Sequence, residues 1–183
     1  MTTLPQITIG AVEGKARGAG NEFLSSLDML FGTTTHTVLS SPEIALGILP
    51  GGGGIQFLTR LIGSGRAMEY ILTATDIGAV EAAQIGWINK AFETTEAMNS
   101  HIDNLISRLL LFSPTALALS KQAISAAARP QLSDLLADSD RFLQTLSDPQ
   151  IPELIGKVLR LSNNQSNETF EQFLGENIPL VYE

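Results

Sequence analysis

The chain has 183 residues, enough for one domain of ordinary size with a helical extension. Apolar residues make up 44% and charged residues 16%, which predicts a folded globular protein and excludes a disordered one. The net charge is −8 and the eleven Lys and Arg residues are scattered, so broad nucleic-acid binding, which needs clustered cations, is not expected. The chain has no cysteine, which excludes disulfides, thiolate nucleophiles and thiolate metal sites.

We expect a cytoplasmic protein. The N-terminus lacks the basic segment and following apolar run that are typical of a signal peptide. No apolar run reaches the length needed to span a bilayer, so no membrane contact is expected. The glycosylation sequons at Asn164 and Asn167 are interpreted as chance matches, because sequons matter only in secreted proteins.

Strands and helices are predicted in alternation over the first half of the chain. β-branched residues predict strands at 6–12, 36–40 and 87–92. Apolar residues at helical spacing predict helices from 19 to about 29 or 30, and at 55–62, 65–72 and 80–85. A turn is expected at 13–18 and a loop at 51–54. Ser64 is expected to cap the third helix, with Met68, Ile71 and Leu72 facing inward, and Trp87 is expected in the core.

Helices are predicted throughout the second half of the chain. They are expected at 94–112, 114–128, from 133 to the prolines at 149 and 152, and at 151–161 and 167–174. Pro114 begins the second of these helices, Pro130 ends it, and Ser133 is expected to cap the third. The coarse prediction is a small α/β layer followed by a helical C-terminal region.

The glycine-rich stretch at 14–54 carries most of the chemical information. A phosphate-binding loop is not supported, because Gly54 is not followed by Lys and Ser or Thr. A dinucleotide fingerprint fails as well, because the third glycine is absent after Gly18 and Gly20. The predicted helix N-terminus around Ala19 instead offers unpaired backbone N–H groups, which suit an oxyanion on a carbonyl. Small residues there allow a substrate to approach the backbone closely.

Two interpretations of the glutamates in this stretch stay open. Glu22 and Glu43 either take part in chemistry or are structural, with Glu22 complementing the helix dipole and Glu43 lying in a loop. The spacing alone favours the structural interpretation. The histidines, His36 and His101, have no carboxylates nearby at ligand spacing, so no metal site is expected.

Several motifs follow one another in a fixed order along the chain. They are the strand at 7–12, Gly14-x-Ala16-x-Gly18-Ala19-Gly20-x-Glu22, Asp28, Pro42-Glu43-Ile44-x-Leu46-Gly47-Ile48-x-Pro50-Gly51-Gly52-Gly53-Gly54-x-Gln56, Leu58-x-Arg60-Leu61-Ile62-Gly63, Ala67-Met68-Glu69, Leu72-Thr73, the segment at 79–90 and Ser113-Pro114…Lys121. Together they resemble the enoyl-CoA hydratase/isomerase (crotonase) family, and the resemblance covers about residues 5–128.

The resemblance implies a crotonase-type α/β spiral core that lacks its N-terminal part, at 1–112, and a C-terminal helical oligomerisation region at 113–183. It implies an acyl-CoA substrate, with no cofactor besides the CoA of that substrate, and enoyl-CoA hydratase or isomerase chemistry of fatty acid metabolism. The family's two catalytic glutamates match Glu22 and Glu43, and one oxyanion-binding N–H matches Ala19. A homo-oligomer, trimer or hexamer, is implied as well. The implied substrate-binding positions are Gly18, Gly20, Pro42 and Gly51.

The sequence also departs from the family pattern. Family members normally carry roughly another third of a chain before the strand that begins at Ile7. In the family, that part holds a further oxyanion N–H, the segment that binds the CoA adenine and several strands. Leu39-Ser40 replaces the usual Phe-Gly before the Pro-Glu pair, and the segment at 148–161 is longer than the family pattern. An alternative function is therefore a catalytically impaired or split family protein that acts as a binding or assembly component.

Overall fold

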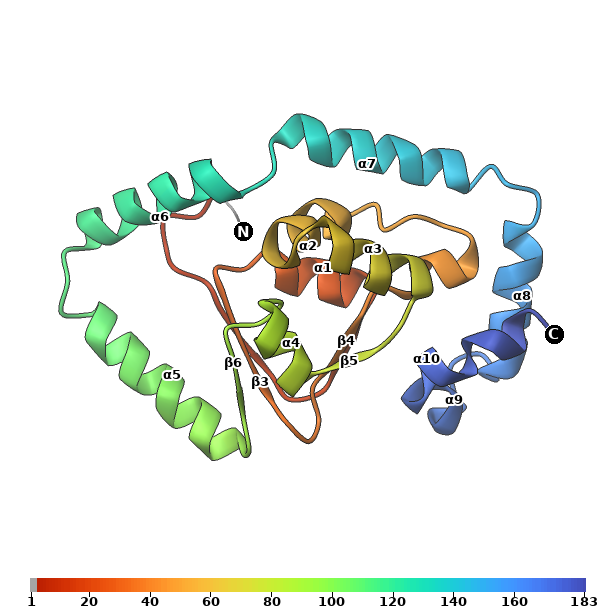
Figure 1. The fold of residues 1–183 in the computed structure, drawn as a ribbon, viewed down its shortest axis with the longest axis horizontal. Coiled ribbons are helices and arrows are strands. Elements are labelled where there is room, and N and C mark those ends of the chain that lie inside the picture. The colour runs from red at the N-terminus through yellow and green to blue at the C-terminus, as the bar shows by residue number, and fades with distance from the viewer. Residues whose placement is uncertain (1–2) are drawn as a thin grey trace.

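An α/β core lies at the centre of the molecule, and helices form an arc around it (Figure 1). The structure is a computed structural model that describes residues 3–183. The strands of the core are β1 (Ile9–Val12), β2 (Lys15–Arg17), β3 (Met29–Thr33), β4 (Val38–Ser40), β5 (Ile77–Gly78) and β6 (Lys90–Phe92). Its helices are α1 (Ala19–Ser25), the 3₁₀ helix η1 (Pro42–Leu46), α2 (Gly54–Ile62), α3 (Ser64–Thr73) and α4 (Ala79–Ile85).

The strands form two small sheets, and the chain passes from one sheet to the other as it adds successive strands. The first sheet has the order β1-β3-β6 with all pairs parallel, and Gly10 lies opposite Leu30 in its register. The second has the order β2-β4-β5, with β2 and β4 parallel and β4 and β5 antiparallel. Because parallel neighbours need long crossovers, helices occupy the connections. Successive turns of the chain thus add strands to both sheets, which confirms the predicted α/β spiral.

The hydrophobic core is formed by residues of both sheets together with α2, α3 and α4. Its most deeply buried large side chains include Leu39, Leu58, Ile77 and Trp87, each at most 1% exposed. Full burial of one large apolar side chain contributes roughly 1.5–3 kcal/mol to stability. The prediction that Trp87 is a core residue is therefore confirmed.

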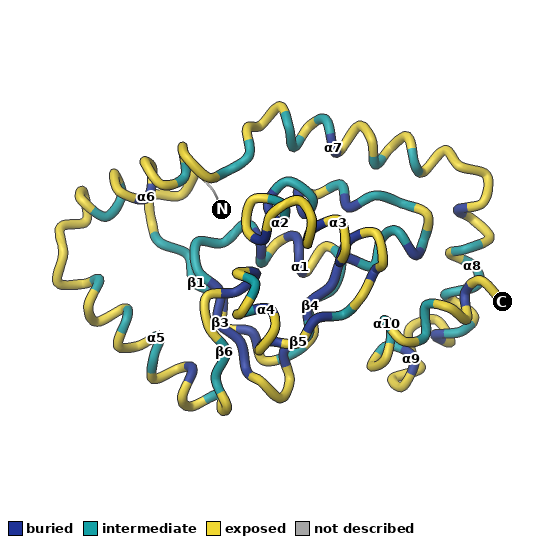
Figure 2. Tube along the Cα trace, in the orientation of Figure 1, coloured by how far each residue is buried: buried dark blue, intermediate teal, exposed yellow. Residues whose placement is uncertain are grey.

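The C-terminal half is helical, as predicted. It consists of α5 (Thr95–Leu109), α6 (Pro114–Ala128), α7 (Leu132–Thr145), α8 (Ile151–Leu161), α9 (Glu168–Gln172), α10 (Leu174–Asn177) and the 3₁₀ helix η2 (Ile178–Val181). Helices α5 to α8 trace the arc in Figure 1, and Figure 2 shows that most of this arc is exposed while the central sheets are buried. The side chain of Thr94 caps α5, and that of Ser113 caps α6.

Large apolar side chains are exposed along the arc. Leu110, Leu111, Ile124 and Leu132 are 68–80% exposed. Among the described residues, no single helix has the length and apolarity to cross a membrane, although α5 and α6, bent by 113°, pass the length and composition test as a pair. Clusters of exposed apolar residues on a folded protein mark surfaces that contact other molecules.

The predicted first helix was too long. Helix α1 ends at Ser25, and the residues from Met29 to Thr33 form strand β3 instead. This strand lies between β1 and β6, and its residues from Leu30 onward are buried. A strand that is buried on both faces has a continuous apolar sequence, which periodicity cannot distinguish from a helix. The expected turn at 13–18 likewise contains β2, and β5 was not predicted.

Two predicted helix caps were also wrong. Ser64 is the first residue of α3, and Gly63 occupies the cap position. Ser133 lies inside α7, where Gln131 is the cap and its N–H donates to Asp134. The predicted inward face of α3 was only partly correct, because Ile71 is buried whereas the side chains at 68 and 72 are exposed.

Candidate active site

Helix α1 begins at a glycine that turns the chain out of strand β2. Gly18 has φ of 55°, in the left-handed region that favours glycine, and this conformation redirects the backbone into the helix. Ala19 and Gly20 follow and are exposed. Within residues 3–183 the N–H of Ala19 has no hydrogen-bond acceptor. The first turn therefore presents a free backbone donor to solvent, as expected for a helix N-terminus.

Glu22, in the first turn of α1, is held by the backbone of the glycine loop. Its Oε1 accepts hydrogen bonds from the N–H groups of Gly52 and Gly54, both at 2.9 Å. The glutamate is 9% exposed. A Cβ at position 52 would lie 2.6 Å from Glu22 Oε2, and a Cβ at position 54 would lie 2.8 Å from its Cγ. A side chain at either position would therefore displace the Glu22 carboxylate from the loop.

Glu43 lies in η1, directly after Pro42, which stands in the first turn of that helix. Its Oε1 would be 3.2 Å from a Cβ at position 18, so the carboxyl group lies beside the start of α1. Its Oε2 is buried and has no hydrogen-bond partner among the described residues. Burial raises the pKa of Glu43 to about 7; a hydrogen bond from its own backbone opposes the rise, and the negative charge of Glu22 adds to it.

The structure brings most of the predicted site residues to one place. Those around the start of α1 and in η1 are Gly18, Ala19, Gly20, Glu22, Pro42 and Glu43. Gly51 directly precedes Gly52, whose N–H donates to Glu22, and the side of Gly51 on which a Cβ would lie faces α7, 2.5 Å from the Cβ of Phe142. In the described part of the chain, no three acidic or histidine side chains gather in a group that could hold a metal ion.

A buried asparagine next to Glu22 was missed by the sequence analysis. Asn21 is 0% exposed and accepts a hydrogen bond from Trp87 Nε1 at 3.1 Å. Its Nδ2 donates to Ser41 Oγ at 3.1 Å, and Ser41 is the residue before Pro42. These two hydrogen bonds could not be predicted from the sequence, because Asn21, Ser41 and Trp87 are far apart along the chain. None of the three belongs to a local motif that indicates such a contact.

The C-terminal helices support the site from outside. The hydroxyl of Tyr182 donates to the carbonyl oxygen of Ala45 in η1 at 2.8 Å. A Cβ at Gly47 would lie 2.6 Å from Ile151 of α8, so this helix packs directly on the end of η1. The segment that carries Glu43 is therefore held between the core and the C-terminal region.

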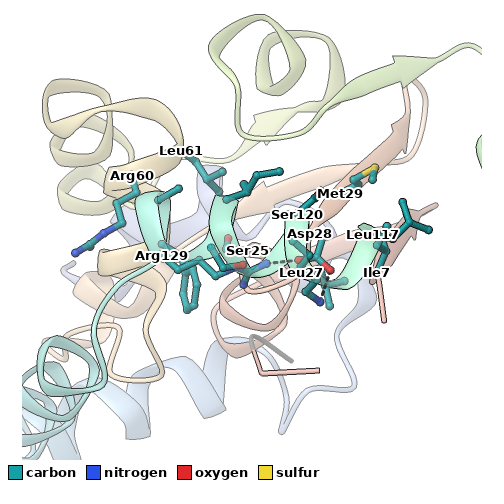
Figure 3. Close-up of a pocket in the computed structure, with 15 residues that line it drawn as sticks. Ile7, Ser25, Leu27, Asp28, Met29, Arg60, Leu61, Leu117, Ser120 and Arg129 are labelled. Carbon is teal, nitrogen blue, oxygen red and sulfur yellow. Dashed lines mark hydrogen bonds and ion pairs between the residues drawn. The ribbon is translucent and has the colours of Figure 1, made fainter. Parts of the chain in front are cut away.

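An apolar cavity of about 410 Å³ lies elsewhere, between the end of α1, α2 and α6 (Figure 3). Asp28 at its wall pairs with Lys121 at 2.7 Å and with Arg129 at 2.5 Å. Burial alone would raise the pKa of Asp28, but hydrogen bonds from Lys121 and Thr8 outweigh burial and keep this pKa below its ordinary value. The charged groups of this cavity are thus already paired, and neither candidate glutamate lines it. We place the candidate site at the glutamates instead.

The sequence is similar to those of known proteins of one family. The sequence profile described as Enoyl-CoA hydratase/isomerase matches residues 1–153. A short-chain-enoyl-CoA hydratase of Clostridium acetobutylicum is 38% identical over 145 residues, which are 79% of this chain and 55% of that protein.

Two solved structures are also similar. A candidate enoyl-CoA hydratase from Streptomyces avermitilis superposes with a TM-score of 0.92 at 34% identity, over 97% of this chain and 63% of that one. A candidate enoyl-CoA hydratase from Thermobifida fusca, in complex with acetoacetyl-CoA, gives 0.64 at 32% identity, over 74% and 52%.

The chain spans between 52% and 63% of the lengths of these three proteins. The profile match nevertheless covers most of the chain, and the fold agrees with that of the solved relatives. The chain belongs to the enoyl-CoA hydratase/isomerase family.

Proposed function

We propose that this chain carries out acyl-CoA thioester chemistry of the enoyl-CoA hydratase/isomerase type. The observation that carries the proposal is the position of Glu43. Its carboxyl group lies next to a second carboxylate and a helix N-terminus, and its buried Oε2 has no hydrogen-bond partner within residues 3–183. Its pKa of about 7 lets it both give and take a proton near neutral pH. The proposal is also supported by the solved relative that contains acetoacetyl-CoA. It requires no cofactor besides the CoA of the substrate.

The two carboxylates can divide the work of adding water to an α,β-unsaturated thioester. Glu22 takes a proton from water through the oxygen that the loop does not hold, and the water oxygen bonds to the β-carbon. The electron pair of the double bond moves toward the thioester oxygen. Glu43 gives its proton to the α-carbon, and the proton on Glu22 returns to Glu43 through solvent. The sum is one water added and the enzyme unchanged.

Negative charge develops on the thioester oxygen in the transition state, and a hydrogen-bond donor must be in place to stabilise it. The free N–H of Ala19 supplies one, assisted by the positive end of the α1 dipole. A proton shift between carbons would use the same enolate and the same two carboxyl groups, which is the isomerase form of the proposal. Removing one oxyanion donor typically lowers rates roughly 100- to 1000-fold, so the Ala19 N–H is expected to contribute strongly to the rate.

The hydration of crotonyl-CoA tests the proposal. Glu22→Gln and Glu43→Gln should each lower kcat by roughly 100-fold or more, because each removes a group that moves a proton. Glu93→Gln changes an exposed glutamate and serves as the matched control. Wild-type turnover no faster than that of the two site variants would refute the proposal. Binding of CoA thioesters without turnover would favour the alternative, a binding or assembly component.

We also propose self-association through the helical arc, as a trimer or hexamer. The exposed apolar side chains of α5, α6 and α7 support this proposal. Light scattering after size-exclusion chromatography would test it, and a monomer at micromolar concentration would contradict it.

A further inference from the structure

The side chain of Asn21 links the two elements that carry the glutamates. It lies on α1 immediately before Glu22, and its amide reaches Ser41, two residues before Glu43. The other end of the amide is fixed by the indole of Trp87 in the hydrophobic core. All three linked residues are at most 1% exposed. A single buried side chain thus spans α1, the start of η1 and the core.

Chemistry settles the orientation of this amide. An indole N–H can only donate, so the atom of Asn21 that faces Trp87 must be the carbonyl oxygen. The NH₂ group then faces Ser41 Oγ, which must accept. Turning the amide over would place two donors against each other at the indole. Both bonds therefore depend on one rotamer, and that rotamer fixes the distance between α1 and Ser41.

We propose that Asn21, fixed by Trp87 and acting through Ser41, is a positioning residue that sets the placement of Glu43 relative to Glu22. The inference rests on the proposed function. No direct hydrogen bond joins the two carboxyl groups: the loop glycines hold Glu22, and Glu43 Oε2 has no partner among the described residues. Their separation follows from the backbones of α1 and η1, which the Asn21 side chain joins.

Two neighbouring serines provide a matched test. Ser41 and Ser40 are both 0% exposed, but the hydroxyl of Ser40 has no hydrogen-bond partner in the part of the chain that the structure describes. Ser41→Ala removes the acceptor of Asn21 and leaves a buried donor unpaired, whereas Ser40→Ala removes no bond. We expect Ser41→Ala to lower kcat for crotonyl-CoA hydration about tenfold, with KM changed less than about twofold, because displacement of a reacting group lowers the rate of the chemical step.

A merely structural role would not move the pH midpoint of kcat, so this midpoint is the second measurement. We expect it to shift in Ser41→Ala and in Trp87→Phe, which removes the indole donor, and to stay unchanged in Ser40→Ala. Unchanged kcat and midpoint in both Ser41→Ala and Trp87→Phe, with wild-type circular dichroism, would overturn the inference.

Failure of the proposed function can be distinguished from failure of this inference. A wild-type chain that does not hydrate crotonyl-CoA contradicts the proposed function alone. In that case the Glu43 carboxyl is titrated by carbon-13 NMR, with Glu43→Gln to assign its signal. A midpoint that moves in Ser41→Ala but not in Ser40→Ala supports positioning by Asn21, and an unmoved midpoint refutes it.

Discussion

Replacing Glu43 with glutamine should change how the stability of the fold depends on pH. The folded pKa of Glu43 is about 7, whereas its ordinary value is 4.5. Between these values the unfolded chain has lost this proton and the folded chain keeps it, so the free energy of unfolding falls as pH rises. Since each pKa unit corresponds to about 1.4 kcal/mol, the ionised Glu43 costs the native state on the order of 3 kcal/mol above pH 7. Glu43→Gln removes this cost.

Urea unfolding followed by circular dichroism measures the effect. The free energy of unfolding of Glu43→Gln should exceed that of the wild type by an amount that grows by about 2.5 kcal/mol between about pH 5 and pH 8. Other titrating groups are shared by the two proteins and cancel in this difference. A difference that stays constant within about 0.5 kcal/mol over the same range would refute the raised pKa, and with it the reason for assigning proton transfer to Glu43.

Two further substitutions test contacts that hold the site and the helical arc. Gly54→Ala would place a Cβ 2.8 Å from Glu22 Cγ, so it should destabilise the fold by about 1–3 kcal/mol and lower turnover. Gly65→Ala, in α3 with nothing within 4 Å, is its control and should be neutral or stabilising; equal effects in thermal unfolding would contradict the close approach. Lys121→Met should cost about 2 kcal/mol, less than a fully broken buried pair, because a second cation stays on Asp28. Urea unfolding that shows no loss would contradict a structural role for this ion pair.

The sequence predicted the elements whose signals are local. The helices predicted at 94–112 and 114–128 are present as α5 and α6, and the side chains of Thr94 and Ser113 cap them. Strand β3 was missed because its burial on both faces results from β1 and β6, which are far away in the sequence. Apolar periodicity describes one exposed and one buried face, and β3 has no exposed face.

The sequence predicted only part of the candidate site, again because contacts between distant segments leave no local pattern. The motif order indicated the glutamates through the family resemblance, and the structure places Glu22 and Glu43 together at the start of α1. The groups that hold them were not visible, because they are backbone N–H groups or side chains distant in the sequence. Trp87 was predicted only as a core residue, although its indole also donates to Asn21. Long-range polar contacts of this kind leave no periodic pattern.

The four consecutive glycines of the loop are kept as glycine for different structural reasons, so substitutions at each position are limited independently. Gly51 is constrained by an aromatic side chain of α7, Gly52 and Gly54 by the carboxylate of Glu22, and Gly53 by its φ of 105°. Since the carboxylate is held by main-chain atoms, loss of Glu22 would release two positions and leave the other two under selection for folding. A lineage that abandons the chemistry should therefore lose its glycines unevenly, at 52 and 54 first.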